Sequence, residues 1–140
     1  MPPPRQEIGA VTLVVPDYDA AIDFYVGRLG FTLVADDRLS PTKRWVLVAP
    51  PGSTGTRLLL AKTADPAQEA AIGNQTGGRV GFFLHTDDFA RDHAAMLAAG
   101  VVFEETPRVE SYGTVAVWRD PFGNRWDLIE FAAAPPAPDP

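Results

Sequence analysis

The segment Asp17–Gly30 reads DYDAAIDFYVGRLG, and a second segment of the same length, Asp87–Gly100, reads DDFARDHAAMLAAG. Each begins with aspartate, which suits the N-terminal cap of a helix, and ends with glycine, which suits the left-handed residue that stops one. Apolar residues recur between them at helical spacing. The pair predicts two equivalent helices and therefore an internal duplication.

The segments around these helices also repeat, because each helix follows one predicted strand and precedes three. The expected strands are residues 8–15, 31–36, 43–49 and 56–62 in the first half, and 79–86, 101–104, 113–119 and 124–131 in the second. The tight turn DPFGN joins the last two. A single module would leave one sheet face exposed, so the two are expected to pack together. The fold predicted is α+β, with two βαβββ modules forming a curved eight-stranded cup.

The expected organisation follows from these patterns. Residues 1–7 form a flexible N-terminus, 8–62 the first module, 63–78 a linker and 79–131 the second module. Residues 132–140 are rich in proline and predicted to be disordered.

Composition excludes several classes of function. The chain has 140 residues and a net charge of −6, which disfavours nucleic acid and anionic membrane surfaces as partners. It has no cysteine, so thiolate nucleophiles and iron–sulfur clusters are excluded, and a reducing cytoplasm is the expected location. No secretory signal or membrane span is visible.

Three runs carry a family resemblance: VTLVVPDYDAAIDFYVGRLGF, VGFFLHTDDFARDHAAMLAAGV and GTVAVWRDPFGNRWDLIEF. They resemble the vicinal oxygen chelate superfamily, which includes glyoxalase I, extradiol dioxygenases and the bleomycin- and fosfomycin-resistance proteins. The resemblance covers the chain from about Ile8 to Phe131. It implies the glyoxalase/bleomycin resistance fold and a homodimer, and it leaves the substrate open because one scaffold hosts several chemistries.

The resemblance also implies where a divalent metal would be held, with one ligand on each of four strands, often two histidines and two glutamates. The corresponding positions here are Ala10, a residue within Leu58–Leu60, Gly81 (or Val80), and Asp127. Only Asp127 offers a ligand atom, and one carboxylate does not hold a transition ion. We expect no cofactor, with a relocated divalent metal as the alternative.

His85 and Asp127 are the candidate catalytic residues. Strand alternation places Gly81, Phe83 and His85 on one face, from which His85 would point into the cup toward Asp127. Histidine suits proton abstraction beside a carbonyl. The alternative for each is structural: a hydrogen-bonded histidine, and a carboxylate satisfied by Arg125, Arg57 or backbone donors.

The candidate ligand-binding residues are mostly aromatic. The rings of Trp45, Phe83 and Trp118 suit stacking on a planar molecule, and the resemblance implies that Tyr112 lies beside the mouth of the cup. Arg57 completes the set.

Three functions remain open. The first is a metal-independent cup that binds a small organic molecule, similar to the antibiotic-sequestering members of the family. The second is a lyase, isomerase or dioxygenase that uses His85 and Asp127. The third is a dimeric module whose cup is filled by its own side chains.

Overall fold

A computed structural model describes residues 2–132, so all of the predicted disordered tail except Ala132 lies outside the described residues. The chain divides into two compact units between Ile72 and Gly73, within the segment predicted as a linker. Unit 1 comprises residues 2–72 and unit 2 comprises residues 73–132. Both are βαβββ modules with an open, curved sheet, as the sequence predicts.

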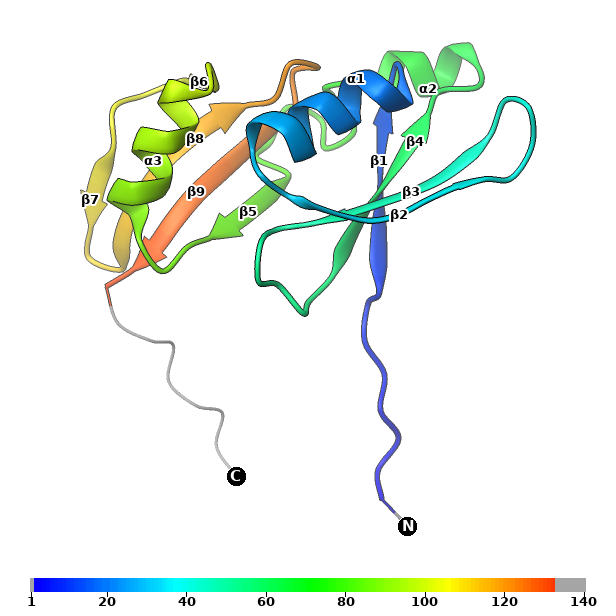
Figure 1. The fold of residues 1–140 in the computed structure, drawn as a ribbon. Coiled ribbons are helices and arrows are strands. Elements are labelled where there is room, and N and C mark those ends of the chain that lie inside the picture. Colours follow the sequence, from blue (N-terminus) through cyan, green and yellow to red (C-terminus); the bar gives the residue numbers. More distant parts are fainter. Residues whose placement is uncertain (1, 133–140) are drawn as a thin grey trace. The chain divides into compact units, whose positions relative to one another are not determined.

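Unit 1 contains a four-stranded sheet, shown in Figure 1. Its strands lie in the order β1 (Ala10–Val15), β4 (Arg57–Lys62), β3 (Arg44–Ala49) and β2 (Thr32–Arg38). β1 and β4 are parallel and the other pairs are antiparallel. Every second residue faces the helix, and those of β1, β3 and β4 are buried: Leu13, Val15, Val46, Val48, Leu58 and Leu60.

The first predicted helix forms in two parts. α1 (Tyr18–Ile22) is capped by Asp17, whose side chain accepts a hydrogen bond from the Ala20 amide at 2.9 Å. It continues as a π-helix, η1 (Asp23–Arg28), and Gly30 ends it at a φ of +79°. The wider π-helical turn buries both Phe24 and Tyr25, whose rings meet edge to face.

A further short helix, α2 (Pro66–Ala71), lies in the segment predicted as a linker. Asp65 caps it by accepting from the Gln68 amide at 2.8 Å, and Pro66 occupies the first turn, where a missing amide costs nothing. Among the described residues, no helix is long and apolar enough to cross a membrane.

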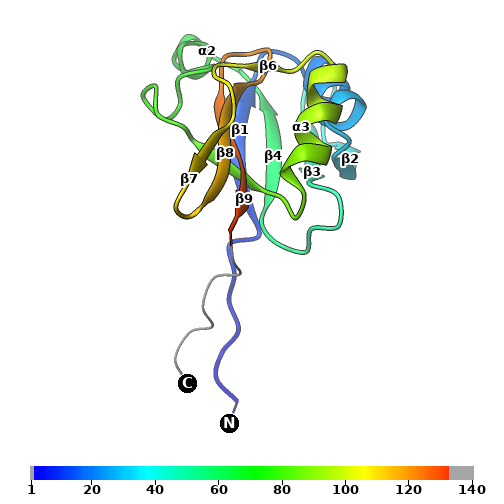
Figure 2. The same ribbon diagram turned by 90° about the vertical axis from the view of Figure 1, so that its left-hand side faces the viewer.

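Unit 2 repeats the plan of unit 1. β5 (Phe82–His85) is parallel to β9 (Arg125–Phe131), as β1 is to β4. β8 (Gly113–Arg119) pairs with β9 and, on its other edge, with two short strands, β6 (Val102–Phe103) and β7 (Arg108–Glu110). Figure 2 shows β7 beside β8 at this edge. β7 lies between two of the strands that the sequence predicts, residues 101–104 and 113–119.

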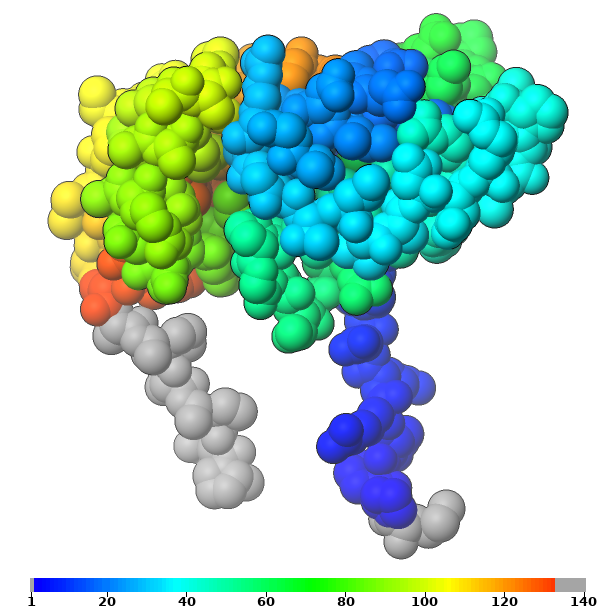
Figure 3. Space-filling view, in the orientation of Figure 1, coloured from blue at the N-terminus to red at the C-terminus, as the bar shows by residue number. Residues whose placement is uncertain are grey.

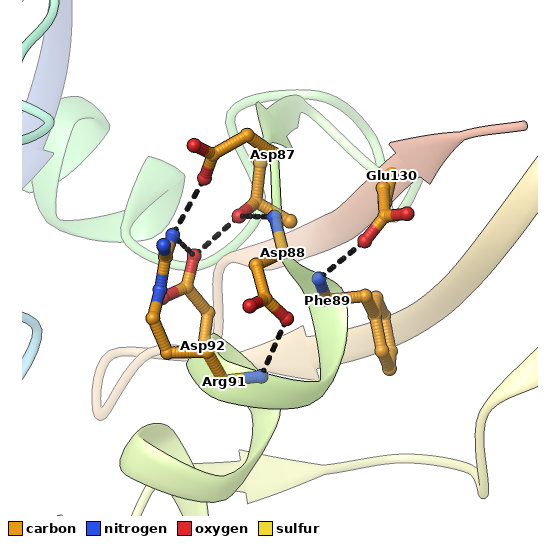
Figure 4. Close-up of polar contacts among 7 residues, drawn as sticks. Asp87, Asp88, Phe89, Arg91, Asp92 and Glu130 are labelled. Carbon is orange, nitrogen blue, oxygen red and sulfur yellow. Dashed lines mark hydrogen bonds and ion pairs between the residues drawn. The ribbon is translucent and has the colours of Figure 1, made fainter. Parts of the chain in front are cut away.

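The second predicted helix, α3 (Phe89–Ala98), packs against β9. Asp88, rather than the predicted Asp87, is its cap and accepts from the Arg91 amide at 3.0 Å. Asp87 instead pairs with the Arg91 guanidinium (Figure 4). Phe89 and Met96 are buried, whereas Leu97 is 51% exposed. Glu130 of β9 accepts from the Phe89 amide at 2.6 Å, so the sheet itself supplies a second acceptor to this helix terminus (Figure 4).

The turn between β8 and β9 is held by a buried aspartate. Asp120 is 4% exposed. Its carboxylate accepts hydrogen bonds from the amides of Phe122 and Asn124 and from the Asn124 side chain, at 2.9, 2.8 and 2.6 Å. Since this turn connects the two longest strands of unit 2, it fixes their register and the position of Asp127.

We predict that Asp120→Ala lowers the free energy of unfolding by about 2 to 3 kcal/mol, because it leaves buried donors without their charged acceptor. Urea unfolding measures this loss. The exposed Asp37 provides a matched control, since Asp37→Ala is expected to stay within about 0.5 kcal/mol of the unchanged protein. Equal effects of the two substitutions would contradict the role assigned to Asp120.

Candidate functional site

The two faces of the unit 2 sheet have different surroundings. Trp126, Leu128 and Glu130 of β9 point toward α3, as the contact of Glu130 with the helix terminus shows. Because side chains alternate along a strand, Asp127 and Ile129 point the other way. The β5 residues paired with them, Phe83 and His85, share that face. We call it the α3-distal face, defined by Phe83, His85, Asp127, Ile129 and Phe131.

Asp127 lies in the middle of this face, between Phe83 of β5 and Val117 of β8. Its Oδ1 atom is buried and has no hydrogen-bond partner within residues 2–132. Burial raises the pKa of Asp127 above its usual range; Arg108 opposes this shift and Glu105 adds to it. The carboxyl group is therefore costly to ionise as it stands, and a donor from outside the chain would relieve that cost.

A cluster of ion pairs lies along the β7 edge of the sheet. Arg108 binds Glu105 at 2.7 Å and Glu110 at 2.8 Å. Glu105 also accepts from the Val117 amide at 2.8 Å, and the Arg108 contact is the main cause of its lowered pKa. The sequence interpretation missed Glu105 and Arg108. Reading RVE as a strand would have shown Arg108 and Glu110 on one face, next to each other.

His85 does not reach Asp127 in this arrangement. It pairs with Ile129, two residues farther along the strands than the pair of Phe83 and Asp127, and its ring lies edge to face with the Phe131 ring at a centroid distance of 5.0 Å. Within the described chain no hydrogen bond or ion pair joins His85 to Asp127. The two share a face as predicted, but the direct contact considered from the sequence is not formed.

The predicted aromatic residues have different environments. Phe83 is 59% exposed next to Asp127, and Tyr112, in the turn between β7 and β8, is 46% exposed. Tyr112 also contributes a hydrogen bond that raises the pKa of Arg108. Trp118, by contrast, is fully buried and stacks on Trp126 at 4.9 Å on the face toward α3. The strand register turns Trp118 into the core, a position that does not favour the ligand stacking expected from the sequence.

The remaining two candidates lie in unit 1. Trp45 is 41% exposed near the start of β3, on the sheet face opposite the buried Val46. Arg57 is the exposed first residue of β4, opposite Ala10 of β1. Their part in ligand binding stays a prediction.

The residues present do not fit the metal that the family resemblance implies. Ala10 and Gly81 have no side-chain donor, and all residues of Leu58–Leu60 are apolar. A Cβ atom at Gly81 would lie 2.6 Å from Cγ2 of Thr76, so a ligating residue there would require the Thr76 side chain to shift. Across residues 2–132, no group of three or more His, Cys, Asp or Glu side chains is placed to hold a metal ion. We therefore derive no chemistry through a metal at these positions.

Comparison with known proteins gives the family. The model of the Glyoxalase/Bleomycin resistance protein/Dioxygenase superfamily matches residues 7–128. An uncharacterized protein from Shewanella frigidimarina (strain NCIMB 400) is 52% identical over 127 residues, which cover 90% of this chain and 94% of that protein.

Two crystal structures resemble the chain throughout. UcmS2 matches with a TM-score of 0.78 and 28% identity, covering 89% of this chain and 98% of the other. TnmS3, an antibiotic binding protein from Streptomyces sp. CB03234, matches with a TM-score of 0.73 and 31% identity, covering 91% and 98%. The chain belongs to the Glyoxalase/Bleomycin resistance protein/Dioxygenase superfamily.

Proposed function

We propose that this chain binds a small planar organic molecule without a metal, and sequesters it by hydrogen bonding to Asp127 and stacking on Phe83. The observation that carries the proposal is the buried Oδ1 atom of Asp127, which has no hydrogen-bond partner within residues 2–132. A buried carboxylate oxygen without a donor costs free energy, and such a residue is retained where a ligand supplies the missing interaction. The exposed Phe83 ring lies directly beside it.

The ligand chemistry follows from these two residues. An ionised carboxylate accepts hydrogen bonds and attracts positive charge, so the ligand presents an N–H or O–H donor. The neighbouring Arg108 does not compete for Asp127, because its guanidinium binds Glu105 and Glu110. A flat apolar ring completes the match, since aromatic side chains favour stacked or edge-on partners.

The family supports binding as the activity. TnmS3 is described as an antibiotic binding protein and is 31% identical to this chain. The enzymatic alternative, with His85 as base and Asp127 as its partner, has no supporting contact among the described residues. The homodimer and the cytoplasmic location stay predictions.

We predict that a planar ligand with a donor binds more tightly than its counterpart without one. By isothermal titration calorimetry, 4-aminoquinoline is expected to bind about tenfold more tightly than 4-methylquinoline, because a hydrogen bond to a charged group is worth about 1.5 to 3 kcal/mol. Asp127→Asn should abolish this preference, whereas Phe83→Ala should weaken both ligands. Leu97→Ala, on the exposed side of α3, is the control. A preference that survives in Asp127→Asn would contradict the proposal.

We predict a pH-dependent effect of Asp127 on stability. Since the pKa of Asp127 is raised by burial, its contribution to stability is complete below the ordinary value of 3.8 and is lost as pH rises through the folded-state pKa. Asp127→Asn should thus be more stable than the unchanged protein at pH 7, and the difference should shrink as pH falls toward 3.8. Urea unfolding across this range tests it, with the exposed Asp37→Asn as control. A variant that is less stable at pH 7 would refute the assignment.

We predict that nickel, zinc, manganese and iron(II) cause no saturable rise in the midpoint of thermal unfolding, because a metal that bound the native state would stabilise it by mass action. Metal analysis of the purified protein accompanies this measurement. A stoichiometric metal whose stabilisation disappears in His85→Ala would establish a relocated site and favour the enzymatic alternative.

A further inference from the structure

A groove in unit 1 lies at the end of the sheet where β3 begins and β4 ends. Its volume is about 620 Å³. Its walls come from the start of α1, the β2–β3 turn, the two strands, and the chain that leads into α2. The lining includes Tyr18, Lys43, Arg44, Trp45 and Lys62.

The groove exists because β3 and β4 separate at this end. Their pairing stops at Val46 and Leu60, whereas β2 and β3 remain paired as far as Arg38 and Arg44. The β2–β3 hairpin therefore extends beyond the end of the β3–β4 pairing, and its tip (cyan) projects in Figures 1 and 3. Trp45 has no β4 partner in the sheet, which leaves its ring 41% exposed at the edge of the gap.

The lining of this groove is positively charged although the chain as a whole is acidic. The net charge is −6, and the sequence contains only two lysines, Lys43 and Lys62. Both line the groove together with Arg44, and no acidic residue does. Arg44 is engaged by Asp19 and Asp36, at 2.9 and 2.7 Å. Neither lysine forms an ion pair within residues 2–132, so both ammonium groups are available to a ligand.

Tyr18 adds a buried hydrogen-bond donor. It is only 7% exposed, and its hydroxyl oxygen accepts from the Arg44 amide at 3.1 Å. A phenol that accepts one bond still carries a proton to donate. That proton has no acceptor among the described residues, and the side chain lines the groove. The hydroxyl is thus a ready donor for an anion.

We propose that this groove binds a planar aromatic anion, with its ring against Trp45 and its carboxylate near Lys43 and Lys62, where the Tyr18 hydroxyl donates to it. Ammonium and phenol groups are donors that suit a carboxylate, and an exposed indole suits a flat ring. The site lies away from Ala10, the first of the positions that the family uses for a metal. Ala10 is at the opposite end of β1, five residues from the Val15–Lys62 pair, which corresponds to about 16 Å along the strand.

This inference goes beyond the function proposed above, because it concerns the other unit and a ligand of opposite charge. The two therefore fail independently. If Asp127 does not favour a ligand with a donor, the proposal for anion binding in the groove still stands. If the groove does not bind an anion, the proposal for Asp127 still stands.

The test is an NMR titration of the three tryptophan indole N–H signals with benzoate, benzylamine and inorganic phosphate. Trp118 and Trp126 are buried and act as internal references, and Trp45→Phe assigns the third signal. Benzoate should shift the Trp45 signal with saturation. Benzylamine, which has the ring without the negative charge, and phosphate, which has the charge without a ring, should each act at least about tenfold more weakly.

Variants separate a bound anion from nonspecific effects. Lys43→Gln with Lys62→Gln should weaken benzoate by about tenfold or more, as should Tyr18→Phe, which keeps the ring and removes the donor. Arg91→Gln with Arg119→Gln, both in unit 2, removes the same charge elsewhere and should leave binding unchanged. Unaltered spectra of the ligand-free variants verify folding. The proposal is overturned if benzylamine shifts Trp45 as strongly as benzoate, if phosphate alone does so, or if the benzoate shift survives in the double lysine variant.

Discussion

The alternation of side chains along β9 is the constraint on which the rest of unit 2 depends. The strand lies between β5 and β8, so neither of its edges is exposed. Trp126, Leu128 and Glu130 point to α3, where they fill the core and supply an acceptor to the helix terminus. Once those three are placed, Asp127 must lie on the opposite face. A slip of one residue would bury Asp127 in the core and expose two large apolar side chains.

The position of Asp127 costs stability in the isolated chain. Its Oδ1 atom lacks a donor and burial raises its pKa, while the charged groups nearby are engaged with one another. Proteins retain a destabilising residue of this kind where it serves a function, because a group that must bind a ligand cannot also be fully satisfied within the fold. Leaving one carboxylate incompletely satisfied prepares it for a ligand. The same logic applies to the Tyr18 hydroxyl in unit 1, which is buried yet keeps a proton to donate.

The duplicated modules have diverged in charge. In unit 1 the two lysines of the chain gather at the end of β3 and β4, whereas in unit 2 the β7 edge carries glutamates paired with arginine. Both arrangements arise where a sheet departs from the simple repeat. In unit 1 two strands separate, and in unit 2 an added strand, β7, pairs with β8. Two modules with the same scaffold can thus acquire different binding properties where the edge of a sheet is irregular.

The sequence by itself determined the modular plan, because that plan rests on local rules. Periodicity distinguishes strands from helices, Asp17 and Gly30 have the chemistry of helix ends, and the repeat of the pattern gives the duplication. The sequence also shows, without a structure, that Ala10 and Gly81 have no side-chain atom that could bind a metal. Tertiary structure alone decided which face each residue occupies and what lies beside it. It placed Trp118 in the core, set His85 two residues along the strands from the pair of Phe83 and Asp127, made Asp88 the cap in place of Asp87, and brought Lys43 and Lys62 to one groove. These outcomes depend on strand register and on contacts between distant segments, and local sequence patterns do not specify either.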